Sequence, residues 1–148
     1  MIIRRMDMSD VPYVYELEKK VFGQSLEKSM LYDELLHNDM AHYFIALEAG
    51  DRIGYFGLWV TKPHAQILNL VVAKGQRRKG YGETLLKKGL ETCRSLNVDT
   101  LSLEVRPSNK AALALYEGQG FDIAARRKNY YNNGEDAFLM TKKIGGFS

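Results

Sequence analysis

Residues 67–86, ILNLVVAKGQRRKGYGETLL, join an apolar run to a predicted helix through a basic loop that contains three glycines. Ile67 to Val72 is short and apolar, as in a strand that is fully buried. From Gly80 to about Arg94, apolar residues recur at helical spacing. Where a strand passes into a helix, backbone N–H groups are unpaired, the helix dipole favours anions, and glycines let the main chain approach a phosphate. The stretch therefore predicts a buried strand, an anion-binding loop and a helix.

The residues of this loop narrow the kind of anion that it binds. Gly75 and Gly80 have the spacing of a Walker A loop, but Tyr81 and Gly82 occupy the positions where Lys and Ser or Thr meet phosphate and magnesium. A dinucleotide-binding fingerprint needs a further glycine three residues after Gly82, where Leu85 stands. Nucleoside triphosphate hydrolysis and classical NAD binding are both disfavoured.

Outside this stretch, caps, turns and hydrophobic spacing predict six further strands and three further helices. The strands are expected at Ile2 to Arg5, His42 to Ala49, Arg52 to Val60, Thr100 to Arg106, Phe121 to Tyr130 and Asp136 to Lys142, and the helices follow caps at Asp7 or Ser9, at Ser25 and at Asn109. The order is β-α-α-β-β-β-α-β-α-β-β. A chain of 148 residues is long enough for one compact core, so a single domain over residues 1–148 is expected, with a frayed tail at 145–148.

Two finer expectations concern side-chain direction and turn type. Leu26, Met30 and Leu35 recur at helical spacing and are expected to face the core from a second helix that runs to about Asn38. Asn132-Asn133-Gly134 is expected to form a type I′ turn between the last two strands, because Asn-Gly favours that turn.

Composition and charge disfavour several classes of protein. The net charge is +3, and basic residues gather at Arg77 to Lys79, Lys87 to Lys88 and Arg126 to Lys128, without interleaved aromatic residues. This pattern favours a polyphosphate ligand over nucleic acid. The three histidines and the single cysteine lack metal-ligand spacing. Cys93 lies on the apolar side of its predicted helix and is interpreted as a buried structural thiol.

The distribution of apolar residues also disfavours a membrane protein. No stretch approaches the roughly 18 apolar residues of a membrane span. Residues 1–7, MIIRRMD, lack the apolar run of a signal peptide. A cytoplasmic protein with no membrane partner is therefore expected.

A second informative stretch is LEVRPSN at residues 103–109, followed by ALYE at 114–117. Alternation along the strand places Glu104 on the face opposite its apolar neighbours, where partial removal from water would make the carboxylate a candidate general base. A surface ion pair with a neighbouring Lys or Arg is the alternative. Asn109 and Tyr116 are seven residues apart, on roughly the same side of a helix. Asn109 can cap that helix or bond a ligand amide, and Tyr116 is either a core residue or part of a site.

These motifs resemble those of a known family. Arg77-x-x-Gly80-x-Gly82 after an apolar strand is similar to the pyrophosphate-binding motif of the GNAT acetyltransferases. Residues 103–121 resemble the corresponding segment of the bacterial ribosomal-protein-alanine acetyltransferases, and the resemblance extends to RKNYY at 127–131, EDA at 135–137 and LNLVV at 68–72. It covers roughly residues 43–141. It implies an α/β (α+β) GNAT fold, with a mixed, mostly antiparallel seven-stranded sheet flanked by about four helices.

The resemblance also implies an N-acetyltransferase that uses acetyl-CoA and no metal, and it assigns roles to residues. Glu104 would take a proton from the substrate amine through water, and Tyr116 would protonate the departing thiolate. Tyr130 and Tyr131 would shape a peptide slot. Coenzyme A would be held by the pantetheine-binding strand, the pyrophosphate loop and an asparagine, which are Leu70, Val71, Val72, Arg77, Arg78, Lys79, Gly80, Tyr81, Gly82, Glu83 and Asn109.

Two departures from this branch of the family bear on the acceptor. Residues 23–26 are Gly-Gln-Ser-Leu where Pro-Trp-Ser is common, and His64 stands where an acidic residue is often found. The expected acceptor is the N-terminal alanine of a small-subunit ribosomal protein. Another protein N-terminus, a lysine or a small amine is the alternative, and a non-catalytic acetyl-CoA-binding module is a third interpretation.

Overall fold

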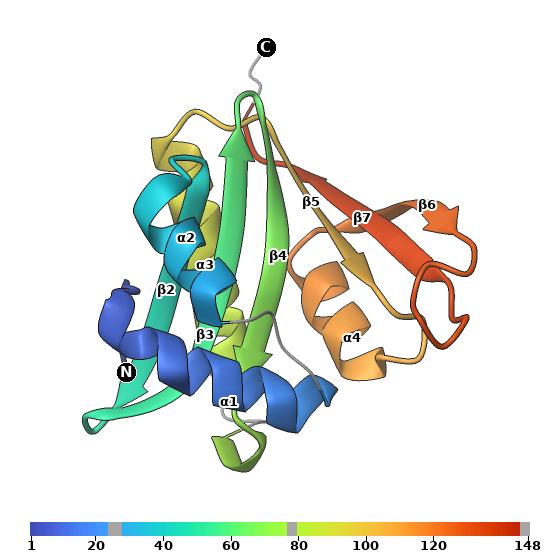
Figure 1. Cartoon of the computed structure of the whole chain (residues 1–148). Helices are drawn as coiled ribbons and strands as arrows, with labels where there is room; N and C mark the ends of the chain where they lie inside the picture. Colours follow the sequence, from blue (N-terminus) through green and yellow to red (C-terminus); the bar gives the residue numbers. More distant parts are fainter. Residues whose placement is uncertain (24–27, 77–79, 146–148) are drawn as a thin grey trace. The chain divides into compact units, whose positions relative to one another are not determined.

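Seven strands are hydrogen-bonded in the order β1-β2-β3-β4-β5-β7-β6 in the computed structural model, which describes residues 1–23, 28–76 and 80–145 (Figure 1). The pairs β1–β2, β2–β3, β5–β7 and β6–β7 are antiparallel, and β4–β5 is parallel. The predicted element order and the mixed, mostly antiparallel sheet are confirmed. The strands are β1 (Ile2–Arg5), β2 (Ala41–Glu48), β3 (Asp51–Thr61), β4 (His64–Val72), β5 (Thr100–Val105), β6 (Asp122–Arg127) and β7 (Ala137–Lys143). The helices are α1 (Val11–Phe22), α2 (Lys28–His37), α3 (Tyr81–Ser95) and α4 (Lys110–Gly118), with short 3-10 turns η1 (Met8–Asp10) and η2 (Lys74–Gln76).

The described residues group into two compact units. The first unit is Met1–Trp59 with Leu68–Gly89, and the second is Val60–Ile67 with the described part of Leu90–Ser148. Strands β3 and β4 and helix α3 contribute residues to both units. A single domain over residues 1–148 stays a prediction.

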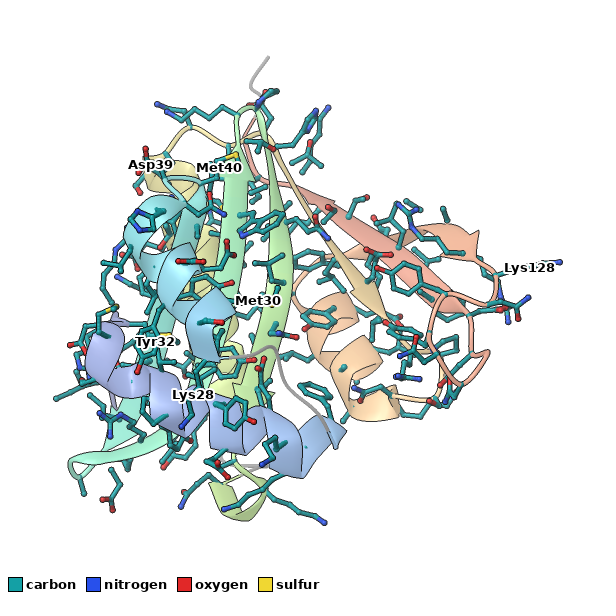
Figure 2. All side chains as sticks on the ribbon, in the orientation of Figure 1. Lys28, Met30, Tyr32, Asp39, Met40 and Lys128 are labelled. Atoms are coloured by element: carbon teal, nitrogen blue, oxygen red, sulfur yellow. The ribbon has the colours of Figure 1, made fainter. Side chains whose placement is uncertain are left out.

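In the first unit, α1 and α2 cover the same face of β2 and β3 (Figure 1). Within α2, Leu31 is buried and Leu35 packs against the same core, one helical turn further on. Met30 is 50% exposed, so the prediction that it faces the core is wrong. It lies on α2 between Lys28 and Tyr32 (Figure 2), about 100° around the helix from Leu31. The buried cluster comprises Met6, Val11, Val14, Leu17, Leu31, Tyr43, Ile45, Tyr55 and Val71. Leu26 and the predicted cap Ser25 lie outside the described residues.

The opposite face of the same strands packs against the first half of α3. Phe44 of β2 and Phe56 of β3 are buried, with their ring centroids 6.4 Å apart. A Cβ atom at Gly89 of α3 would lie 2.4 Å from Cζ of Phe56. Glycine is required there because the helix backbone approaches the ring too closely for any side chain.

The entry to α1 is fixed by an aspartate that lies in the first unit with no exposed surface. Asp10 accepts hydrogen bonds from Arg4 at 2.7 and 2.9 Å, from Arg52 at 2.7 Å and from the N–H of Asp7 at 2.8 Å. Burial by itself would raise the pKa of Asp10, but these donors outweigh it and lower the pKa to about 2. Asp7 in turn accepts from the N–H of Ser9 at 2.9 Å and caps the 3-10 turn η1. Helix α1 itself begins after Asp10, so the prediction that Asp7 or Ser9 caps this helix is wrong.

The predicted hairpin of β2 and β3 is confirmed, although its turn is one residue earlier than expected. Ala49 and Gly50 have φ angles of 51° and 86°, so both central turn residues are left-handed. The prediction that Ile67 to Val72 is a fully buried strand is wrong. Strand β4 begins already at His64, and its central residues, Leu68 to Leu70, are only half-buried.

In the second unit, β5 pairs in parallel with β4 over three residues, from Thr100 to Ser102. Leu101, Leu103 and Val105 are buried on one face, as the alternation predicted. Helix α4 begins at the predicted cap, Asn109, which accepts from the N–H of Ala112 at 3.1 Å. It is followed by Gly120 with φ of 91°.

The hairpin of β6 and β7 differs from its prediction in the turn. Nine residues, 128–136, connect the strands, and Asn132 and Asn133 do not have positive φ, so the type I′ turn is wrong. Gly134 instead donates to the carbonyl of Tyr131 at 2.9 Å, inside the longer loop. β6 ends the sheet order, and all six of its residues are exposed. After β7, the N–H of Gly145 donates to the carbonyl of Asp99 at 3.4 Å. Residues 146–148 of the predicted frayed tail lie outside the described residues.

Candidate active site

The predicted anion-binding loop is described from Gly80 onward, in the first unit. Gly80 has φ of 78°, and a Cβ atom there would meet nothing within 4 Å, so the left-handed backbone is what requires glycine. The carbonyl of Gly80 accepts from the N–H of Thr84 at 3.1 Å, which closes the first turn of α3. The N–H groups of that turn, from Tyr81, Gly82 and Glu83, have no acceptor within the helix. Arg77, Arg78 and Lys79 lie outside the described residues.

The end of β4, predicted to bind pantetheine, is held closely by β3. A Cβ atom at Gly54 would lie 2.4 Å from the carbonyl oxygen of Val71, and the N–H of Ala73 donates to the carbonyl of Ile53 at 2.8 Å. Val71 is buried, whereas Leu70 and Val72 are half-buried. The role of these residues in binding coenzyme stays a prediction.

Glu104 lies on β5 in the second unit, with its side chain 14% exposed. Its Oε2 atom is 3.1 Å from Nε of Arg127 on β6, with β7 between the two strands. This contact is an ion pair without hydrogen-bond geometry, so within the described part of the chain Oε2 is a buried oxygen that accepts no hydrogen bond. A buried carboxylate oxygen in this state can still accept a proton or a donor from a ligand.

Two tyrosines of the β6–β7 loop lie beside this carboxylate. The rings of Tyr130 and Tyr131 are perpendicular, with centroids 5.0 Å apart. Burial and then the charge and hydrogen bonding of Glu104 raise the pKa of the Tyr130 phenol. The structure therefore brings together Glu104 and both residues that were predicted to shape a peptide slot.

Tyr116 of α4 is buried in the second unit and packs edge-on against Phe121, with ring centroids 5.7 Å apart. Burial, and after it the neighbouring Tyr131, raise the pKa of Tyr116 to about 12. The phenol is therefore protonated at neutral pH and can donate a proton. Asn109, two turns earlier, is exposed and caps α4 through Oδ1, and its Nδ2 atom has no acceptor among the described residues.

Arg127 contacts Glu104, but the sequence predicted no role for it at the site. It was grouped with Arg126 and Lys128 as a basic cluster that favours a polyphosphate. In the structure Arg127 pairs with Glu104, and Arg126 pairs with Asp136 at 2.6 Å. Lys128, the residue after β6, extends outward (Figure 2). The alternative of a surface ion pair for Glu104 is thus partly realised, but with a carboxylate that is largely buried.

No group of three or more potential metal ligands occurs within residues 1–23, 28–76 and 80–145. Cys93 has no exposed surface, and burial raises the pKa of its thiol to about 11. Its interpretation as a buried structural thiol is confirmed. His64 is exposed at the start of β4, where it pairs in register with Thr100. Among the described helices, none has the length and apolar character needed to cross a membrane.

Comparison with known proteins identifies the family. The model of the acetyltransferase (GNAT) family matches residues 11–121. The chain therefore belongs to the GNAT family and is an N-acetyltransferase. Its strand order, its four helices and the resemblance of its motifs agree with this assignment.

Within the family, the chain is similar to ribosomal-protein-alanine acetyltransferases. It is 40% identical over 139 residues to a Bacillus subtilis protein provisionally named a ribosomal protein bS18-alanine N-acetyltransferase, covering 93% of this chain and 92% of that one. It is 32% identical to the Salmonella typhimurium enzyme of that name, covering 94% and 95%. The crystal structure of the Escherichia coli ribosomal-protein-S18-alanine N-acetyltransferase superposes with a TM-score of 0.89 at 29% identity, covering 99% of this chain and 96% of that one.

Proposed function

We propose that this enzyme transfers the acetyl group of acetyl-CoA to the α-amino group of an N-terminal alanine, on the ribosomal protein that its relatives modify, bS18. The relatives' names support the acceptor, and GNAT acetyltransferases use acetyl-CoA as cosubstrate. The bound acetyl-CoA would supply a thioester that the amine attacks directly, so neither a metal nor a covalent enzyme intermediate is needed. The cytoplasm, where ribosomal proteins are made, is the proposed location.

The observation that carries this proposal is the buried oxygen of Glu104, in the compact unit that also contains Tyr116. Glu104 has a buried oxygen that accepts no hydrogen bond from the described residues, and Tyr116 has a phenol that stays protonated at neutral pH. Glu104 would take a proton from the attacking amine, and Tyr116 would give its proton to the departing sulfur. Tyr130 and Tyr131, beside Glu104, would guide the peptide to this carboxylate.

Binding of the coenzyme is assigned to the residues that the family resemblance implies. Leu70, Val71 and Val72 would hold pantetheine through their main chain, and the first turn of α3 would hold the pyrophosphate together with Arg77, Arg78 and Lys79. The left-handed Gly80 at the start of α3 and the favourable helix dipole fit this role. Asn109 caps α4 through Oδ1 and would use its Nδ2 atom to bond a pantetheine carbonyl.

The test is release of coenzyme A thiol from acetyl-CoA with a hexapeptide that copies the N-terminus of bS18. The parent should turn over this peptide and leave the same peptide with a blocked N-terminus untouched. Glu104→Gln and Tyr116→Phe should each lose most of the turnover while keeping the parent's affinity for acetyl-CoA.

The other outcomes separate the alternatives. Turnover of spermidine or of a lysine side chain, but not of the alanine peptide, would contradict the acceptor and keep the enzyme class. Acetyl-CoA binding without turnover of any amine would instead support a non-catalytic binding module.

A further inference from the structure

The loop between β6 and β7, residues 128–136, is held in shape by hydrogen bonds of its own. We call it the acceptor loop because it carries Tyr130 and Tyr131. The N–H of Asn129 donates to Asp136 at 2.9 Å, and the N–H of Tyr131 donates to the carbonyl of Glu135 at 3.0 Å. The backbone of Tyr131 is therefore tied directly to Glu135.

The side chain of Glu135 joins the acceptor loop to the connection between β5 and α4. Its Oε1 atom accepts from Arg106 at 3.2 Å, and its Oε2 atom accepts from the N–H of Ser108 at 3.0 Å. Both oxygens are thus used by groups outside the loop. Ser108 directly precedes Asn109, the cap of the helix that carries Tyr116.

Arg106 completes the connection by touching the loop in three places. Its guanidinium lies over the ring of Tyr131, 3.8 Å from the centroid, and it donates to Asn133 at 3.1 Å as well as to Glu135. A planar guanidinium suits this combination of stacking and hydrogen bonding. The ring of Tyr131 is therefore held from its face by Arg106 and from its backbone by Glu135.

An isolated ion pair with this exposure would contribute little to stability. The side chains of Arg106 and Glu135 are 40% and 24% exposed, so solvent screens most of their attraction. The arrangement differs from such a pair because the carboxylate of Glu135 links Arg106 to Ser108, while the backbone carbonyl of the same residue accepts from the N–H of Tyr131. Its main effect is therefore expected on the position of Tyr131 and only slightly on folding.

We propose that Glu135 is a positioning residue for the acceptor: through Arg106 and Ser108 it holds Tyr131 beside Glu104 and so sets the affinity for the incoming peptide. This inference rests on the proposed function. Neither Glu135 nor Arg106 needs to touch the reacting atoms. The precision of the slot depends on them because small displacements of a positioning group lower acceptor binding.

The position of Tyr131 is tested first, by NMR on the full chain. Glu135→Ala should shift the ring resonances of Tyr131 and speed hydrogen exchange of the Ser108 N–H by about tenfold or more, since its acceptor is lost. Glu135→Gln keeps an oxygen for Ser108 but loses the charge at Arg106, so it should shift Tyr131 and leave Ser108 close to the parent. Glu117→Gln, the same change at an exposed residue of α4, is the control and should alter neither. Ring resonances of Tyr131 that stay unchanged in Glu135→Ala would overturn the proposal.

The kinetic consequence is tested with whichever acceptor the parent turns over. Glu135→Ala should raise the acceptor KM about tenfold, with kcat within about twofold of the parent and acetyl-CoA affinity unchanged. A purely structural role would instead lower the melting temperature and leave KM of the folded enzyme unchanged, which would overturn the proposal. If the parent turns over no acceptor, the proposed function fails, and the Tyr131 resonances alone decide whether Glu135 positions that residue.

Discussion

Each unit of the molecule contains a carboxylate beside tyrosines, and the two carboxylates differ in how well they are hydrogen-bonded. In the first unit, Glu18 of α1 is 4% exposed, and one oxygen accepts from the hydroxyl of Tyr55 and from Asn69 at 3.2 Å. In the second unit, one oxygen of Glu104 is buried beside Arg127 and accepts no hydrogen bond from the described residues. A buried carboxylate oxygen that accepts hydrogen bonds stabilises a fold. A buried carboxylate oxygen that accepts none costs stability and is available to a ligand. The same residue types therefore serve structure in one unit and, on our proposal, chemistry in the other.

The largest expected effect tests the chemical side of this comparison. Glu104→Gln should lower kcat by about 10²- to 10⁴-fold because the amide cannot accept the amine proton. Its melting temperature should fall only slightly, because the ion-pair partner that is lost, Arg127, is 53% exposed. Steady-state kinetics and thermal unfolding on the same samples check both points. A variant with near-parental kcat would remove Glu104 from the mechanism.

The second-largest expected effect tests the structural carboxylate, Glu18. Glu18→Ala should lower the free energy of unfolding by about 3 kcal/mol, since the buried hydroxyl of Tyr55 and the half-buried amide of Asn69 lose their acceptor. Urea unfolding measures this change. The folded fraction should keep far more activity than Glu104→Gln. Loss of activity without loss of stability would reverse the assignment of the two carboxylates.

A third carboxylate, Asp10, extends the comparison to pH. Asp10→Asn should lower the free energy of unfolding by about 2 kcal/mol at pH 7, because the bonds to Arg4 and Arg52 lose their charge. The folded pKa of about 2 lies below the ordinary value of 3.8, so this stabilisation is present above about pH 4 and is lost as pH falls through 2. Urea unfolding of parent and variant between pH 7 and pH 2 should therefore converge. A gap that stayed constant would contradict the role of Asp10.

The smallest effect resolves a single hydrogen bond of the first unit. Tyr55→Phe should lower the free energy of unfolding by about 1 kcal/mol, because Glu18 loses one donor and keeps Asn69. Tyr32→Phe, a half-buried tyrosine of α2, is the matched control and should change stability less. Equal effects in the two variants would mean that the Tyr55 hydroxyl contributes nothing specific.

Local patterns in the sequence predicted most elements but few of the contacts that define the site. The alternation along β5 and the cap at Asn109 depend on neighbouring residues, and both were predicted correctly. The pairing of Glu104 with Arg127 joins two strands that are separated by β7, so no local pattern indicates it. The link from Glu135 to Arg106 and Ser108 spans 27 or more residues and has the same cause.

The errors also have physical reasons. Met30 and Leu31 are both apolar, and only the packing of α2 decides which one is buried. Asn133-Gly134 favours a tight hairpin in isolation, but the contacts of the acceptor loop extend the connection to nine residues. Tertiary contacts overrode local preference in both cases.

Strand β6 has a consequence for the behaviour of the protein at high concentration. It is the last strand in the sheet order, and a regular exposed edge of this kind can recruit a strand from another molecule. Here the register shifts between Ile123 and Ala125, and the strand carries the charges of Asp122, Arg126 and Arg127. An irregular backbone and charged side chains both oppose the addition of a foreign strand. These two features therefore protect the exposed strand β6 against aggregation, and no covering helix is needed.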